Sequence, residues 1–169
     1  MEVLFTVLVA VGLGVLWVVV LRGRSGRTHV PGAPREVDRV LADYRKARWQ
    51  AVADAAPALL ARPSDGGDKA WRPRLELAYG HSLVELDQPD EAVPHLERGL
   101  LLQSAVRRSA SGSDVPPSAD IVFRHLLGWA YAQTGRTSQA RREYRRVLDA
   151  PDLDAATRAK VEASLDALP

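Results

Sequence analysis

A run of nineteen residues without a charged side chain, residues 3–21, constrains this chain more than any other feature. Sixteen of the nineteen are hydrophobic, eight of them Val and five of them Leu. As an α-helix that rises about 1.5 Å per residue, the run is about 28 Å long, close to the roughly 30 Å hydrocarbon core of a bilayer. The sequence therefore predicts a transmembrane helix over residues 1–21 that anchors the chain to a membrane.

Two alternatives to an anchor fit the run less well. A cleaved signal peptide begins with a basic region and ends at a small-residue cleavage site, whereas Glu2 is the only charge before the run and LRGRSGR follows it. A buried core helix of a soluble domain has one apolar face, whereas this run is apolar all round. The uncleaved anchor is the favoured interpretation.

The charges beside the run predict its orientation. Arg22, Arg24 and Arg27 follow it directly, and only Glu2 precedes it. Since basic residues stay on the cytoplasmic side of a membrane, we expect a single-pass protein of the cell membrane whose C-terminal domain is cytoplasmic.

Three small residues recur at four-residue spacing within the run, Thr6, Ala10 and Gly14. Such a ridge lets two membrane helices approach closely, which makes these residues candidates for a transmembrane helix contact and for homo-oligomer formation. The alternative, which we favour, is that they are small residues facing lipid.

Composition and motifs exclude several classes of function. The chain has no cysteine, so it holds no disulfide and no thiolate metal site. It contains no P-loop, GxSxG, HExxH or dinucleotide-binding fingerprint, so we predict no enzyme and no cofactor. A net charge of +2 and the lack of exposed aromatic platforms beside RREYRR (141–146) argue against nucleic acid as a partner. A solvated helix face is the favoured interpretation of RREYRR, and acidic lipid or an acidic partner is the alternative.

The rest of the chain is predicted to be all-α. Residues 22–35 are rich in Gly, Pro and Arg and indicate a basic linker. Beyond it, apolar residues at helical spacing and Gly or Pro breakers predict seven helices, six of them in pairs. Their expected ranges are 35–47, 48–61, 73–86, 91–106, 119–134, 137–150 and 154–167. The 36–169 region is then one helical domain, with loops at 63–68 and 109–118.

Two of the helix pairs repeat with an offset of 48 residues. Gly80, Leu83, Ala92 and Leu96 in one pair correspond to Gly128, Tyr131, Ala140 and Tyr144 in the next. The small residues lie where two helices must approach closely, and the bulky residues fill the space between them. Gly135 is the expected C-cap before the second helix of the later pair.

This pattern resembles the tetratricopeptide repeat, a 34-residue helix–turn–helix unit with small and bulky residues at these positions. The resemblance implies a short α-solenoid: a degenerate repeat at 36–63, repeats at 73–106 and 119–151, and a capping helix at 153–168. In the degenerate repeat the register is open by one residue, and the turn lacks its glycine.

The resemblance also implies a concave groove, built from the first helix of each pair, that binds a peptide or partner protein. Its candidate residues are Arg74, Leu77, His81, Val84, Glu85, Val122, His125, Trp129, Ala132 and Gln133. We expect Trp129 to be an exposed aromatic anchor, the alternative being that it packs against the 109–118 loop. His81 and Glu85, four residues apart, are too few for a metal site, and a surface hydrogen bond or salt bridge is the favoured interpretation.

Two functions follow from these features. The first is a membrane-anchored scaffold or adaptor that binds a protein or peptide in its groove and performs no catalysis. The second is an accessory or assembly subunit of a membrane complex, which packs through its transmembrane helix at Thr6, Ala10 and Gly14.

Overall fold

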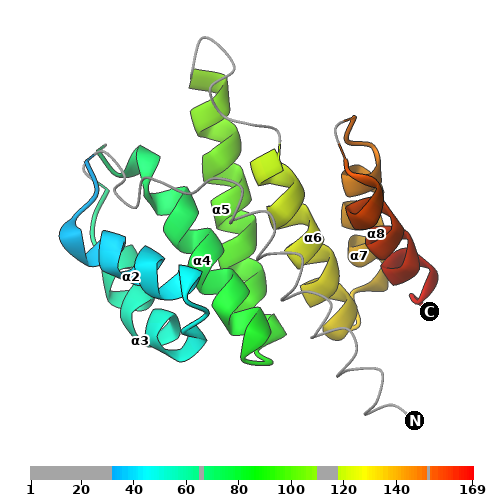
Figure 1. The fold of residues 1–169 in the computed structure, drawn as a ribbon, viewed down its shortest axis with the longest axis horizontal. Helices are drawn as coiled ribbons and strands as arrows, with labels where there is room; N and C mark the ends of the chain where they lie inside the picture. The colour runs from blue at the N-terminus through cyan, green and yellow to red at the C-terminus, as the bar shows by residue number, and fades with distance from the viewer. Residues whose placement is uncertain (1–31, 65–66, 110–117, 152) are drawn as a thin grey trace.

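The computed structural model of the chain describes residues 32–64, 67–109, 118–151 and 153–169. These ranges contain seven α-helices, one short 3₁₀ helix and no strand (Figure 1). The all-α prediction with seven helices is therefore confirmed. The elements are α2 (Arg35–Arg45), α3 (Trp49–Leu60), η1 (Gly67–Ala70), α4 (Arg72–Glu85), α5 (Pro89–Ser109), α6 (Ser118–Gln133), α7 (Thr137–Leu148) and α8 (Ala155–Asp166).

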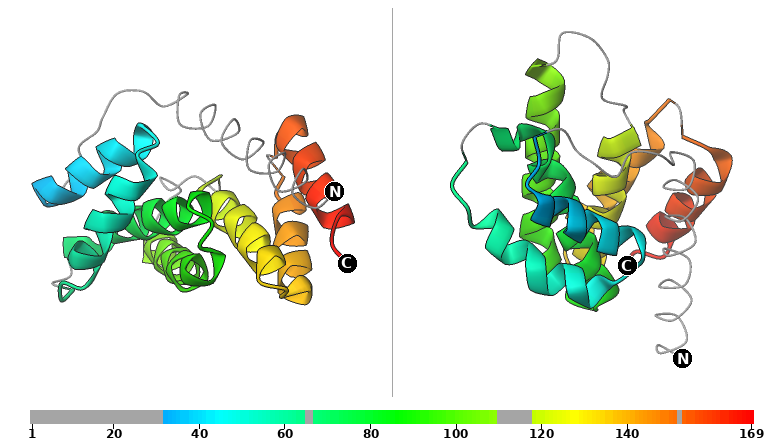
Figure 2. Two further views of the ribbon diagram at one scale, coloured as in Figure 1. Left: turned by 90° about the horizontal axis from the view of Figure 1, so that it is seen from below. Right: turned by 60° about the vertical axis from the view of Figure 1, so that its left-hand side comes forward.

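The helices form a curved array in which each packs on the next along the chain. In addition, α2 contacts α4, and α4 contacts α6, so the first helices of successive pairs also lie side by side. Figure 2 shows the curvature, with α2 and α8 at the two ends of the arc. Since no pair can bury its apolar face alone, this stacking creates the core.

Buried apolar side chains form two clusters. One lies within α2, α3 and α4, around Val37, Val52 and Leu75. The other extends from α4 to α8 and includes Leu96, Phe123 and Tyr144. Half-buried Tyr79 of α4 packs against both clusters, and so connects the first pair to the rest of the array.

The turn inside each helix pair has the same left-handed backbone conformation. Ala47, Asp87 and Gly135 have φ of 54°, 58° and 71°. In each turn the next residue donates its N–H to the carbonyl five residues back, at 3.0, 2.8 and 2.8 Å. This bond pattern ends a helix by satisfying its free carbonyls. All three pairs, the first included, thus share one turn geometry.

The shared turn also resolves the register of the first repeat. Seven residues before the three turn residues stand Val40, Gly80 and Gly128, and nine residues after them stand Ala56, Leu96 and Tyr144. In the second and third pairs a glycine is matched with a bulky residue. In the first pair the sizes are reversed, with valine before the turn and alanine after it.

Replacing Ala47 by glycine is expected to stabilise the protein. A residue with a Cβ in the left-handed conformation destabilises the folded state by roughly 1–2 kcal/mol, which glycine removes. Glycine also makes the unfolded chain more flexible, which offsets part of this effect, so we expect the free energy of unfolding to rise by about 0.5–1 kcal/mol. Chemical denaturation of the purified protein measures this change. Gly135→Ala is the matched control and should destabilise by a similar amount. A loss of stability in Ala47→Gly would show that this turn carries no strain.

The structure differs from the expected element bounds at two places. The 3₁₀ helix Gly67–Ala70 occupies the end of the predicted 63–68 loop. Helix α5 continues to Ser109, three residues beyond its expected end at 106. Its extension is held by an ion pair from Arg107 to Asp120 of α6, with 2.7 Å between nitrogen and oxygen.

The predicted transmembrane helix at 1–21, with Thr6, Ala10 and Gly14, and most of the 22–35 linker lie outside the described residues. None of the helices within the described ranges has the length and apolar character needed to cross a membrane.

Candidate functional site

The two glycines matched by the repeat lie where the helices of a pair meet. A Cβ added to Gly80 would stand 2.7 Å from Leu96 Cγ, and one added to Gly128 would stand 2.6 Å from Tyr144 Cδ1. Because real Cβ atoms do not approach so closely, both positions require glycine unless the neighbour moves. Ala92 and Ala140, in the first turns of the second helices, are fully buried. Gly99, which the repeat did not single out, lies in the same way against Phe123 of the next pair.

The candidate groove residues divide into an accessible and a buried group. Arg74 and Gln133 are exposed, and Leu77, Glu85, Val122 and Ala132 are half-buried. The other four candidates, His81, Val84, His125 and Trp129, are buried. All ten lie on α4 and α6, the two first helices that contact each other in the middle of the array.

His81 is an interior residue and not part of an open groove wall. Its side chain is 0% exposed, and Nδ1 forms a hydrogen bond with the Tyr44 hydroxyl at 2.9 Å. Its Nε2 lies 3.2 Å from Glu85 Oε1, so the expected pair forms, but in the interior instead of on the surface. Trp49 packs on the ring from α3. His81 therefore ties the second pair to α2 and α3 of the first.

Trp129 also differs from its expected place, since only 8% of the residue is exposed. It belongs to the larger apolar cluster, whose packing removes the free aromatic face expected of an anchor. Its indole Nε1 is buried and has no hydrogen-bond partner among the residues that the structure describes. A buried donor without an acceptor costs about 1–3 kcal/mol, so a bound segment with a carbonyl oxygen at this point would remove a real penalty.

His125 stands one turn before Trp129 on α6 and is buried beside the Tyr144 ring. Burial, together with the nearby Lys160 and His81, lowers the pKa of His125 to about 4. Its imidazole is therefore neutral at physiological pH. The inner part of α6 is thus a mainly apolar surface with neutral ring nitrogens.

A buried polar contact joins the two helices of each later repeat. In the first of these repeats, His95 Nδ1 donates to Oε2 of the fully buried Glu76 at 2.7 Å. In the next, Arg124 donates to Glu143 Oε2 at 2.8 Å. The 48-residue offset superimposes Glu76 on Arg124 and His95 on Glu143, so the two contacts are equivalent but of opposite polarity. Comparing the charged residues of the two repeats at the 48-residue offset would have identified both contacts from the sequence.

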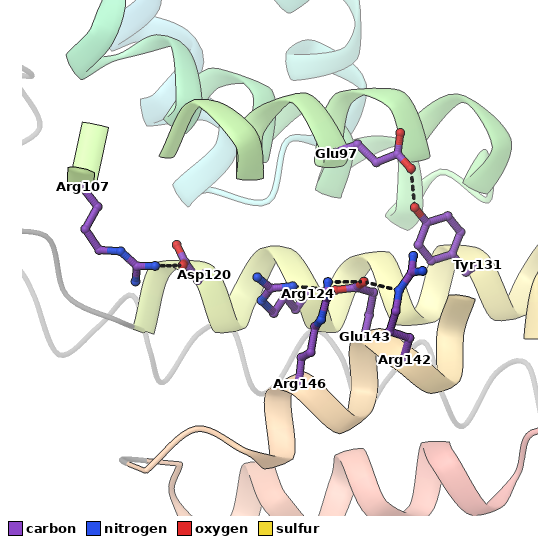
Figure 3. Close-up of polar contacts among 8 residues, drawn as sticks. All are labelled: Glu97, Arg107, Asp120, Arg124, Tyr131, Arg142, Glu143 and Arg146. Atoms are coloured by element: carbon purple, nitrogen blue, oxygen red, sulfur yellow. Dashed lines mark hydrogen bonds and ion pairs between the residues drawn. The ribbon is translucent and has the colours of Figure 1, made fainter. Parts of the chain in front are cut away.

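Glu143 gathers three arginines, as Figure 3 shows. Its Oε2 accepts from Arg124 of α6, while its Oε1 lies 3.1 Å from Arg146 NH1 and 3.3 Å from Arg142 Nε. The carboxylate is 5% exposed, whereas Arg142 and Arg146 are 55% and 52% exposed. Arg142, Arg145 and Arg146 are exposed, as expected of a solvated helix face, and two of them also contact a buried acid.

Tyr131, which the repeat aligns with Leu83, keeps its hydroxyl proton because it is buried. Tyr131 donates a hydrogen bond to Glu97 of α5 (Figure 3). Burial and this bond raise the pKa of Tyr131 above its usual range, so the hydroxyl remains protonated and acts as a donor. The contact joins α6 to the second helix of the preceding repeat.

Within the described ranges, no three histidine or acidic side chains gather in a way that could hold a metal ion. The polar groups described above are hydrogen-bond donors and ion pairs between helices.

Comparison with known proteins agrees with the repeat geometry. The family model described as tetratricopeptide repeat matches residues 73–98 and 121–146, which cover most of α4 and α6 and the first part of their partner helices. No curated protein and no solved structure matches the chain. The two matched segments resemble the tetratricopeptide repeat, and they are 48 residues apart, the same offset that relates the two helix pairs in the sequence.

Proposed function

We propose that the protein is a membrane-anchored tetratricopeptide scaffold that binds a segment of a partner protein along α4 and α6. Tetratricopeptide repeats suggest a scaffold for protein interaction. Membrane attachment through residues 3–21 and the position of the binding surface are the parts that need testing.

The observation that carries the binding surface is the buried indole N–H of Trp129, which has no partner within the described part of the chain. It lies on the first helix of a matched repeat, among half-buried apolar residues that include Val122 and Ala132. An extended peptide offers both a backbone carbonyl for this donor and apolar side chains for the surface around it. The exposed Arg74 and Gln133 mark the edges where a partner would first make contact.

The anchor is supported by the uncharged composition and the length of residues 3–21 and by the arginines that follow. Tethering would raise the concentration of the binding surface near partners in the same membrane. The positive-inside rule would place that surface in the cytoplasm.

Site-specific photocrosslinking of the full chain in its native membranes tests the proposal. A photoreactive residue at Arg74 or Gln133 should form an adduct with a protein partner, whereas the same residue at the exposed Glu97 of α5 should not. Trp129→Phe retains an aromatic ring but removes the donor. Losing one hydrogen bond should weaken capture roughly two- to tenfold.

Stability measurements separate binding from folding. No described residue accepts from the Trp129 N–H, so Trp129→Phe removes the cost of a buried unpaired donor while it leaves a small cavity in the apolar cluster. Because the two effects oppose each other, the variant should unfold at nearly the same denaturant concentration as wild type. Adducts at Glu97 as strong as those at Gln133 would argue against this surface. Extraction of the full chain from membranes by alkaline carbonate would argue against the anchor.

A further inference from the structure

We propose that three arginines of α7, Arg142, Arg145 and Arg146 (the arginine patch), bind the anionic phosphate headgroups of the bilayer to which the chain is anchored. The array would then lie against the membrane through α7 and not extend freely from its linker. The inference rests on the anchor in the proposed function, and it goes beyond that function by giving the domain an orientation.

Two of the three patch arginines contact one buried acid. Glu143 is almost fully buried, and it holds the Arg142 and Arg146 guanidiniums at 3.3 and 3.1 Å (Figure 3). Each contact uses one nitrogen of a guanidinium that carries five N–H donors, so most donors stay free for a phosphate. Arg145 is exposed and forms no ion pair with any described residue.

The positive charge is concentrated on α7 and does not extend over the whole domain. Residues 28–169 carry twenty basic and twenty acidic side chains, so the domain as a whole is neutral. Helix α7 carries four arginines against one acid, and that acid is buried and shared among three guanidiniums. The equivalent position in the preceding repeat is His95, which pairs with a buried acid of its own, so that repeat organises no such patch.

The linker is long enough to let α7 reach the surface of the membrane that holds the anchor. Residues 22–35 are 14 residues, which extend to about 46–50 Å at most. Helix α7 lies about three helix spacings of 8–10 Å from α2, or about 24–30 Å. The domain can therefore lie flat beside its anchor. An anionic leaflet is then the nearest polyanion to the patch, which is why we commit to lipid and not to an acidic protein.

Each arginine near an anionic membrane surface should favour the bound orientation about fivefold. Arg142→Gln together with Arg145→Gln should therefore lower the bound-to-free ratio about 25-fold. The double variant keeps Arg124 and Arg146 on Glu143, so the buried acid remains paired. High salt should act in the same direction, since screening shortens the range of the attraction.

The absence of cysteine makes the measurement direct. In the full chain reconstituted in lipid nanodiscs, Ser138→Cys provides one label site on the exposed start of α7. Nitroxide-bearing lipid headgroups should quench a dye there in discs of anionic phospholipid but not in discs of zwitterionic phospholipid. The Arg142→Gln, Arg145→Gln variant should lose the quenching, and the matched control Arg39→Gln on α2 should retain it.

Equal quenching in anionic and zwitterionic discs, or in the double variant, would overturn the proposal. If the chain fails to insert into nanodiscs, the anchor is wrong, and the patch is then tested by co-sedimentation of the full chain with anionic vesicles. Sedimentation that depends on the patch arginines would support headgroup binding without the anchor. Sedimentation that does not depend on them would overturn it.

Discussion

Replacing Glu76 by arginine should be the most damaging single change in the helical domain. Glu76 is 0% exposed, and its carboxylate lies 2.7 Å from His95 Nδ1 and 3.6 Å from Arg98 NH1. A guanidinium in this place would face two basic groups with no acid to neutralise it. Breaking a buried ion pair lowers the free energy of unfolding by roughly 3–5 kcal/mol. Because Glu76→Arg also adds a buried positive charge beside two basic groups, we expect a loss at the upper end of that range or beyond.

The last repeat, formed by α6 and α7, indicates which second substitution should restore stability. There the polarity is reversed, with Arg124 on the first helix and Glu143 on the second. Glu76→Arg combined with His95→Glu recreates that arrangement, and Arg98 already stands at the position equivalent to Arg146. We expect the double variant to recover roughly 2 kcal/mol relative to Glu76→Arg alone, within the range of interaction energies for contacting charges.

Denaturant unfolding of all four proteins in the cycle, followed by far-UV circular dichroism, measures the coupling. His95→Glu alone should also destabilise, but less than Glu76→Arg, because His95 is partly exposed and its replacement reaches solvent. If the two single losses simply add in the double variant, the equivalence of the two ion pairs is wrong.

Much of the fold could be predicted from the sequence because its signals are local and repeated. Apolar spacing and Gly or Pro breakers gave seven helices, and the 48-residue offset identified the repeat later matched by the family model. The first repeat was less certain, because its turn residue is Ala47 and not glycine. Nothing in an alanine signals a left-handed conformation, which tertiary packing imposes here.

The candidate site was less predictable, because burial depends on neighbours that are distant in the chain. His81 was assigned to a groove by its helix position, yet Tyr44, 37 residues earlier, and Trp49 enclose it. Trp129 occupies the equivalent position one repeat later and is enclosed as well. A periodicity argument identifies the face of a helix, but it does not reveal what packs on that face.

Replacing Gly128 by valine should produce the second large effect, by separating α6 from α7. Even the first added carbon would lie 2.6 Å from Tyr144 Cδ1, and the Tyr144 ring is buried and cannot turn away into solvent. Overpacking a core typically costs 1–3 kcal/mol and occasionally more, and a β-branched side chain against a ring belongs at the upper end, so we expect about 3 kcal/mol. Thermal or denaturant unfolding of the full chain measures it.

The first repeat provides the compensating change. Val40 and Ala56 stand there where Gly128 and Tyr144 stand in the last repeat, and both are buried in one cluster. Gly128→Val with Tyr144→Ala reproduces the first repeat, with the larger side chain on the first helix and the smaller one on the second. The double variant should lose at least 1 kcal/mol less than the sum of the two single variants, since each change makes room for the other. Strict additivity would show that the helix spacing is set elsewhere, for example by the Arg124–Glu143 contact, and that the matched glycine only tolerates it.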